Sequence, residues 1–144
     1  MISDRPATPW HLWVVGVVTF LWNCGGVFDY VMSVTRNADY LAQMAPDQLV
    51  LLTAAPVWAT AAFAVGTWTS LIGSLLLLLR SRWAVWAFAV SLAAYLVNCV
   101  YYFILSDGLG VMGTMGASFS AAIFLIMLFE LWYSRMMAGR GVLR

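Results

Sequence analysis

Residues 10–30 read WHLWVVGVVTFLWNCGGVFDY, an apolar run that is long enough to cross a lipid bilayer. Polar or very small residues interrupt this run at Asn23, at the pair Gly25 and Gly26, and at Asp29. A polar side chain is costly in hydrocarbon unless it faces protein, water or a ligand. We therefore expect the other helices of the protein to pack around this one.

The composition of the whole chain is that of an integral membrane protein. Its 144 residues are 64% hydrophobic and 9% charged, with a mean hydropathy of +0.90, whereas soluble domains are about 25% charged. A membrane-spanning helix needs roughly 20 apolar residues, so this length accommodates about four spans and no soluble domain. The net charge of +1 is too small for a nucleic-acid-binding surface. We predict a single membrane domain, residues 1–144, in contact with lipid.

The segments predicted to cross the bilayer are residues 10–32, 57–79, 83–105 and 109–132. Between the first two spans, Pro46 and Asp47 followed by an apolar stretch indicate a short helix on the membrane surface. Arg80 and Arg82 lie in a tight turn that joins the second and third spans as an antiparallel hairpin. The expected fold is an all-α bundle of four transmembrane helices, with the short surface helix in the first outer loop.

Small residues at helical spacing predict close packing of the spans. They are Ala62, Gly66, Ser70 and Ser74 in the second span and Gly113, Ala117 and Ala121 in the fourth. In the third span a stripe that changes from small to polar residues, expected to face protein, consists of Ala84, Ala87, Ser91, Tyr95, Asn98 and Tyr102. These faces exceed what one small bundle needs internally. We therefore expect a homo-oligomer or association with a larger membrane-protein complex.

The arginines predict the orientation of the bundle. One side carries Arg5, Arg80, Arg82, Arg135, Arg140 and Arg144, and the other side carries Arg36 alone. Because basic residues concentrate in cytoplasmic segments, both termini are expected in the cytoplasm. The amino-terminal segment has no A-x-A cleavage pattern, so the first helix is expected to remain in the mature protein.

Polar and aromatic residues in the outer half of the spans form the candidate ligand-binding site. They are Asn23, Asp29, Tyr30, Tyr95, Asn98 and Tyr102, joined by the mid-span Trp22 and Trp68, which could stack on a flat or sugar-like ligand. The alternative is that these groups only bond between helices. At a rise of about 1.5 Å per residue Asn23 and Asn98 lie at matching depth, so we predict that they meet. Asp29 is expected at the outer aqueous edge near Tyr30, Tyr102 or Arg36.

Chemistry-bearing residues are otherwise sparse. Glu130 is expected about one turn from the cytoplasmic edge, in a structural ion pair with Arg82, Arg80 or Arg135. The single histidine, His11, and two cysteines outside any C-x-x-C motif predict no haem, zinc or iron. No nucleophile–base pair or phosphate-binding loop is present in the sequence, so an enzyme is not expected.

Several motifs together carry a family resemblance. They are PWHLWVVG at 9–16, LWN at 21–23, GxxDY at 26–30, TRN at 35–37, SLLLLLRSRWAV at 74–85 and GVLR at 141–144. The chain resembles a family of short, uncharacterised bacterial inner-membrane proteins with four spans, whose members often carry the label "sugar transporter". The resemblance implies a location in the bacterial inner membrane, and it brings no catalytic residues.

Two functions follow as expectations. The first is a non-enzymatic accessory or scaffold subunit, or assembly factor, of a membrane complex. The alternative is a transporter or binding protein for a small polar solute, with sugar as one class. Whether Asn23, Asp29 and Asn98 turn towards one cavity or each find a protein partner distinguishes the two.

Overall fold

The computed structural model describes residues 6–144, and every regular element in them is helical. The long helices are α1 (Trp10–Val34), α4 (Val57–Leu78), α5 (Trp83–Cys99) and α6 (Gly108–Gly139), and the short ones are α2 (Ala38–Leu41), α3 (Pro46–Thr53) and the π-helical η1 (Val100–Leu105). The segments α1, α4, α5 with η1, and α6 are each long and apolar enough to cross a membrane. The predicted all-α, four-helix membrane bundle is confirmed.

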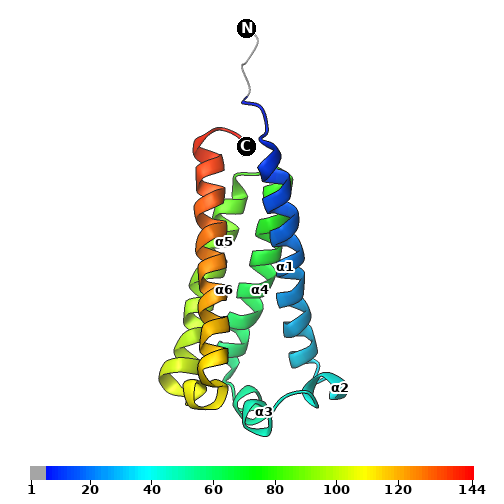
Figure 1. The fold of residues 1–144 in the computed structure, drawn as a ribbon, viewed down its shortest axis with the longest axis vertical. Coiled ribbons are helices and arrows are strands. Elements are labelled where there is room, and N and C mark those ends of the chain that lie inside the picture. Colours follow the sequence, from blue (N-terminus) through cyan, green and yellow to red (C-terminus); the bar gives the residue numbers. More distant parts are fainter. Residues whose placement is uncertain (1–5) are drawn as a thin grey trace.

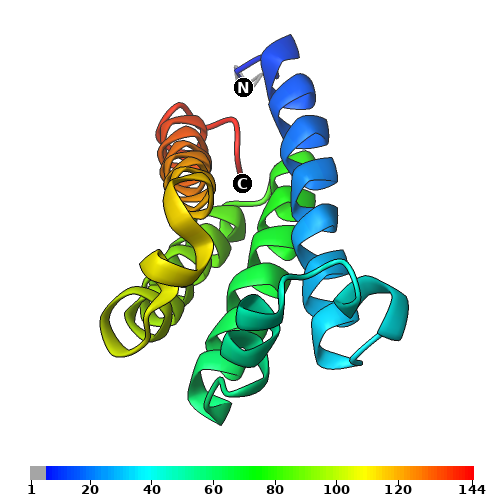
Figure 2. The ribbon, with the colours of Figure 1, turned by 60° about the horizontal axis from the view of Figure 1, so that its bottom comes forward.

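The four long helices lie side by side along the long axis of the molecule (Figure 1). In chain order each packs on the next, α1 on α4, α4 on α5, and α5 on α6. Both described ends of the chain lie at one end of the bundle, and α2 and α3 lie at the other (Figure 1). At that second end α1 and α6 stand apart (Figure 2).

The predicted small-residue faces of the second and third spans pack against each other. Gly66 and Ser70 are buried on α4, and the Ser91 hydroxyl of α5 donates a 2.8 Å hydrogen bond to the Gly66 carbonyl. Gly73 allows the closest approach, because a Cβ added there would lie 2.9 Å from the ring of Phe88. On the α4 side the contact is thus made by residues with little or no side chain, and Gly73 leaves room for the ring of Phe88.

The small-residue face predicted on the fourth span is only partly packed within the chain, since Ala117 alone of its residues is half-buried. Gly113 and Ala121 are exposed. Gly113 has a φ of 63° and a ψ of −166°, so it interrupts α6 near its beginning. That conformation is open to glycine and strained for other residues, so Gly113 serves as a kink and not as a packing surface.

The end of the bundle that holds the chain termini is closed by an apolar core. Leu12, Leu77, Phe88 and Met137 are buried there, and α6 continues to Gly139, beyond the predicted end of the fourth span at 132. The chain then turns back, so that the buried Val142 and Leu143 join this core. Arg144 N donates a 2.7 Å hydrogen bond to Arg80 O, and Arg82 N donates one of 2.6 Å to Arg144 O. The tail is therefore fastened to the α4–α5 turn.

The arginines of the described residues are arranged as the sequence predicts. The α4–α5 turn and the carboxyl terminus lie at one end, and Arg36 follows α1 at the other end. Arg5, which was counted with the first group, lies outside the described residues.

Candidate functional site

A cavity of about 670 Å³ lies within the bundle. Its walls come from all four spans, and residues of the α2–α3 segment, including Tyr40, Gln48 and Leu51, also line it. It reaches inward to Asn23 and Met127 near the middle of the bundle. Small-molecule sites usually measure about 300–1,000 Å³, so this cavity is large enough for a small organic solute.

The structure brings most of the predicted candidate residues to this one cavity. Those that line it are Trp22, Asn23, Asp29, Tyr95, Asn98 and Tyr102. Tyr30 does not line it; its ring packs edge-on against Phe63, with the centroids 5.3 Å apart. Trp68 is 44% exposed on the outer surface of α4 and is also absent from the lining.

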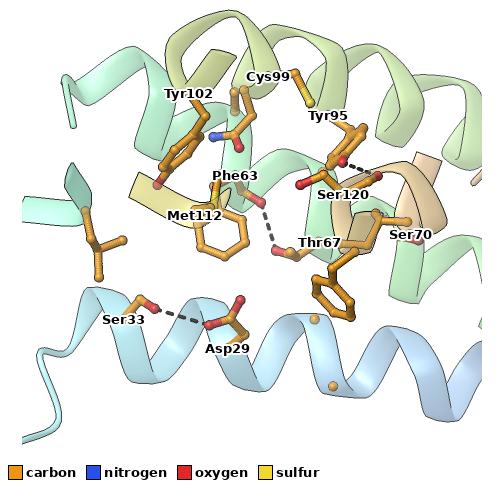
Figure 3. A pocket seen from close by; sticks show the side chains of 18 of the residues that line it. Asp29, Ser33, Phe63, Thr67, Ser70, Tyr95, Cys99, Tyr102, Met112 and Ser120 are labelled. Atoms are coloured by element: carbon orange, nitrogen blue, oxygen red, sulfur yellow. Dashed lines mark hydrogen bonds between the residues drawn. The ribbon is translucent and has the colours of Figure 1, made fainter. Parts of the chain in front are cut away.

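Asp29 presents its carboxylate to the cavity from α1 (Figure 3). Its Oδ1 accepts a 2.5 Å hydrogen bond from the Tyr40 hydroxyl and a 3.4 Å bond from the Ser33 hydroxyl. Burial, followed by the hydrogen bond to Asp29, raises the pKa of Tyr40 to about 12. Tyr40 is therefore a neutral donor at neutral pH, and the charge of Asp29 is not compensated by it.

The partners of Asp29 differ from the prediction. It was expected to point to the aqueous edge near Tyr30, Tyr102 or Arg36. It does share a cavity with Tyr102, but it points into that cavity and is held by Tyr40 of α2. The reason is that the chain after α1 folds back over it. Nothing in the local sequence marks Tyr40 as that partner.

Asn98 and Asn23 do not meet, and the predicted pairing is wrong. Asn98 Nδ2 donates a 3.0 Å hydrogen bond to the Ala59 carbonyl of α4. Asn23 instead bonds to Ser70 and Glu130. The physical reason is the packing order, since α1 and α5 both pack on α4 and not extensively on each other. Matching depth does not make two helices neighbours.

Glu130 lies in a buried polar cluster with Asn23 and Ser70, and it is only 1% exposed. Asn23 Nδ2 donates to Glu130 Oε1 at 2.9 Å and to the Ser70 carbonyl at 3.1 Å. The Ser70 hydroxyl lies 2.8 Å from Asn23 Oδ1 and 3.4 Å from Glu130 Oε2. This cluster joins α1, α4 and α6 at the inner end of the cavity.

The predicted ion pair of Glu130 with Arg82 or Arg135 is therefore wrong. Among residues 6–144, the side chains that hydrogen-bond to Glu130 are those of Asn23 and Ser70. Because α6 continues from 132 to Gly139, Glu130 lies about 10 Å deeper than the predicted helix end implied. Arg135 is exposed on α6, and Arg82 is exposed beside the α4–α5 turn.

Helix α6 contacts α1 through side chains at separate positions along its length. His11 Nδ1 lies 2.5 Å from the Tyr133 hydroxyl near the closed end, and Asn23 meets Glu130 in the middle. Beyond these, the ring of Trp22 lies against that of Phe119, with the centroids 6.4 Å apart. Because both rings line the cavity, they cover part of its side between α1 and α6.

Several lining residues were not among the predicted candidates. They include Phe63, Thr67 and Ser70 on α4, Met112, Phe119 and Ser120 on α6, and the glycines Gly25, Gly26 and Gly66. Ser70 and Gly66 were interpreted as packing residues. Each of them is buried between helices and also lines the cavity. At Gly25 an added Cβ would meet no atom within 4 Å, so this position adds to the free space.

Within residues 6–144, no three histidine, cysteine or acidic side chains come together as a metal site.

Comparison with protein-family models, with curated proteins and with solved structures finds no match for this chain. The family resemblance of the sequence motifs therefore stays an expectation, and the function has to be argued from the cavity.

Proposed function

We propose that the protein binds a small solute in the central cavity and carries it across the membrane. The observation that supports this is the shared lining, because Asn23, Asp29 and Asn98 all turn towards one cavity. Polar side chains inside a membrane protein are costly unless they serve packing or a ligand. Asn23 and Asn98 also bond between helices, but Asp29 has an oxygen for which no described hydrogen bond exists.

Unequal closure of the two ends of the bundle supports transport over simple binding. One end is sealed by the core around Leu12, Phe88 and Met137 and by the tail. The other end holds the α2–α3 segment, whose residues line the cavity, and the cavity extends from there to the middle of the bundle. A carrier with a central site alternates between openings on the two sides. This arrangement corresponds to a state that is closed at the end holding the termini.

The arginine distribution supports termini in the cytoplasm, in accord with the positive-inside rule, and the family resemblance suggests a bacterial inner membrane. In that orientation the cavity faces outward, and the α2–α3 segment lies at the outer surface. The solute would enter from the outside and bind in the outer half of the membrane.

An accessory or scaffold subunit is the second candidate, and the surface of α6 favours it. Among the most apolar stretches of the four spans, that of α6 buries the smallest share of its residues. Its small-residue positions Gly113 and Ala121 are exposed, and small residues are what close helix contacts in membranes use. A stoichiometric protein that co-purifies in mild detergent, and is lost when Ala121 is replaced by Trp, would support this candidate.

A cavity-filling substitution tests the proposal. Gly25 lines the cavity and Gly139 lies at the end of α6, and an added Cβ meets no atom within 4 Å at either position. Uptake of radiolabelled amines, sugars and carboxylic acids would be measured in proteoliposomes. Saturable uptake of one class should disappear in Gly25→Trp and persist in Gly139→Trp. Equal uptake by both variants, or none by the parent protein, would contradict the proposal.

A further inference from the structure

We infer that the solute bound in this cavity is an organic cation with an apolar or aromatic body. This inference rests on the proposed function and names the class of its substrate. It is drawn from the charges and the aromatic rings that line the cavity.

Asp29 is the only charged residue of the lining within residues 6–144, because no arginine or histidine reaches this cavity. Arg36 follows α1 but is exposed, and it lines a smaller neighbouring hollow of about 160 Å³. The hydrogen-bond partners of Asp29 are the hydroxyls of Tyr40 and Ser33, which are both neutral. The cavity therefore carries one uncompensated negative charge, and a cationic ligand would supply the missing partner.

Aromatic rings surround the same space. Those lining it are Trp22, Tyr40, Phe63, Tyr95, Tyr102, Phe103 and Phe119. The face of an aromatic ring attracts a cation, most strongly where water is excluded. Figure 3 shows Asp29 of α1 pointing into the cavity, on the side that faces Phe63 and Thr67 of α4. A carboxylate together with aromatic walls is an arrangement suited to an amine or a quaternary ammonium group.

The charge pattern also argues against two other classes. An anionic solute would meet the Asp29 carboxylate with no basic residue to offset the repulsion. A neutral sugar could stack on the rings, but it would leave the carboxylate without a counter-charge. Sugar is the class that the family resemblance suggests. Removing the charge of Asp29 distinguishes the two classes, because it should weaken the binding of a cation much more than the binding of a neutral sugar.

Two probes of the same shape and opposite charge test this inference, namely tetraphenylphosphonium and tetraphenylborate, with glucose as a neutral third. Binding to the purified protein in lipid nanodiscs would be measured by calorimetry, and empty nanodiscs would give the background. The parent protein should bind tetraphenylphosphonium saturably and at least tenfold more tightly than the other two probes.

Asp29→Asn should weaken that binding by roughly tenfold or more, as the loss of one partner from a buried charge pair does. Asp29→Glu should retain it, which guards against a loss caused by misfolding. Asp39→Asn is the matched control, since Asp39 is exposed on α2 and does not line the cavity. It should bind like the parent protein.

The outcomes separate this inference from the proposed function. If glucose or tetraphenylborate binds at least as tightly as the cation, and Gly25→Trp removes that binding, the cation class is wrong and the cavity still binds solute. The cation class is also wrong if Asp29→Asn leaves binding of the cation unchanged while Gly25→Trp removes it. If no probe binds saturably, or if Gly25→Trp alters nothing, both proposals fail.

Discussion

Asn23 of α1 donates a 2.9 Å hydrogen bond to the carboxylate of Glu130 on α6, across 107 positions of the chain. Both side chains are buried. This bond connects the first span to the last one at the inner end of the cavity, where Ser70 of α4 also joins. It links the stability of the bundle to the residues that shape the cavity.

The polar cluster predicts different effects of two Glu130 substitutions on the free energy of unfolding. Glu130→Gln retains an oxygen for Asn23 and an amide for Ser70, so the free energy of unfolding should stay near that of the parent protein. Glu130→Leu removes the acceptor for one Asn23 N–H and the longer bond of the Ser70 hydroxyl, while the bonds between Asn23 and Ser70 remain, and it should lower that free energy by about 1–3 kcal/mol. Unfolding in mixed detergent micelles measures this difference. Equal losses in the two variants would show that Glu130 does not act through these hydrogen bonds.

Asn23 and Asn98 should contribute to stability independently of each other. Asn23→Leu leaves Glu130 and Ser70 without their partner, so it should cost about 1–3 kcal/mol. Asn98→Leu removes one interhelical bond to a helix carbonyl, worth about 0.6 kcal/mol. Because the two residues lie on different helix contacts, the double variant should lose the sum of the two costs. A coupling energy between the two substitutions well above about 0.5 kcal/mol would instead indicate a direct Asn23–Asn98 pair.

How far the sequence predicts this molecule depends on the range of each signal. Apolar length and small-residue spacing are local, so the four spans and the buried face around Gly66 and Ser70 could be predicted. Depth along a helix is also local, which is why Asn23 and Asp29 were expected in one region.

Which helices are neighbours is not a local property, and there the prediction for Asn98 failed. The end of α6 could not be placed because Arg135 suggests an exit from the membrane. Tyr133 and Met137, on the same helix face as Glu130, are nevertheless buried. The partner of Asp29 was missed for a similar reason. Tyr40 reaches it only because the loop after α1 folds back.

The carboxyl-terminal tail is predicted to stabilise the closed end of the bundle. Deletion of residues 142–144 removes the buried Val142 and Leu143 and the backbone bonds with Arg80 and Arg82. Each buried apolar side chain is worth about 1.5–3 kcal/mol, so the deletion should lower the melting temperature clearly. Arg144→Ala keeps the backbone bonds and should melt like the parent protein. A deletion variant with unchanged melting would contradict the packing of the tail.

The titration of Tyr40 reports on its contact with Asp29. Because the pKa of Tyr40 is raised to about 12 in the folded protein, against about 10 in an unfolded chain, its contribution to stability is fully present below pH 10. That contribution is lost as the pH rises from about 10 to 12. The difference in tyrosinate absorbance between the parent protein and Tyr40→Phe should place this pKa near 12. Asp29→Asn should lower it, and a Tyr40 pKa near 10 in the parent protein would contradict the contact.

The central claim is that a cavity open to small solutes lies inside the bundle, and the reactivity of single cysteines tests it most directly. In a background lacking Cys24 and Cys99, Ser120→Cys places a thiol on the cavity wall. Ser134→Cys places one in the fully buried core. A small water-soluble thiol reagent should label the protein at position 120 and not at position 134, and adding Gly25→Trp should abolish the labelling at 120. No labelling at 120, or labelling that Gly25→Trp leaves unchanged, would contradict the presence of an open cavity.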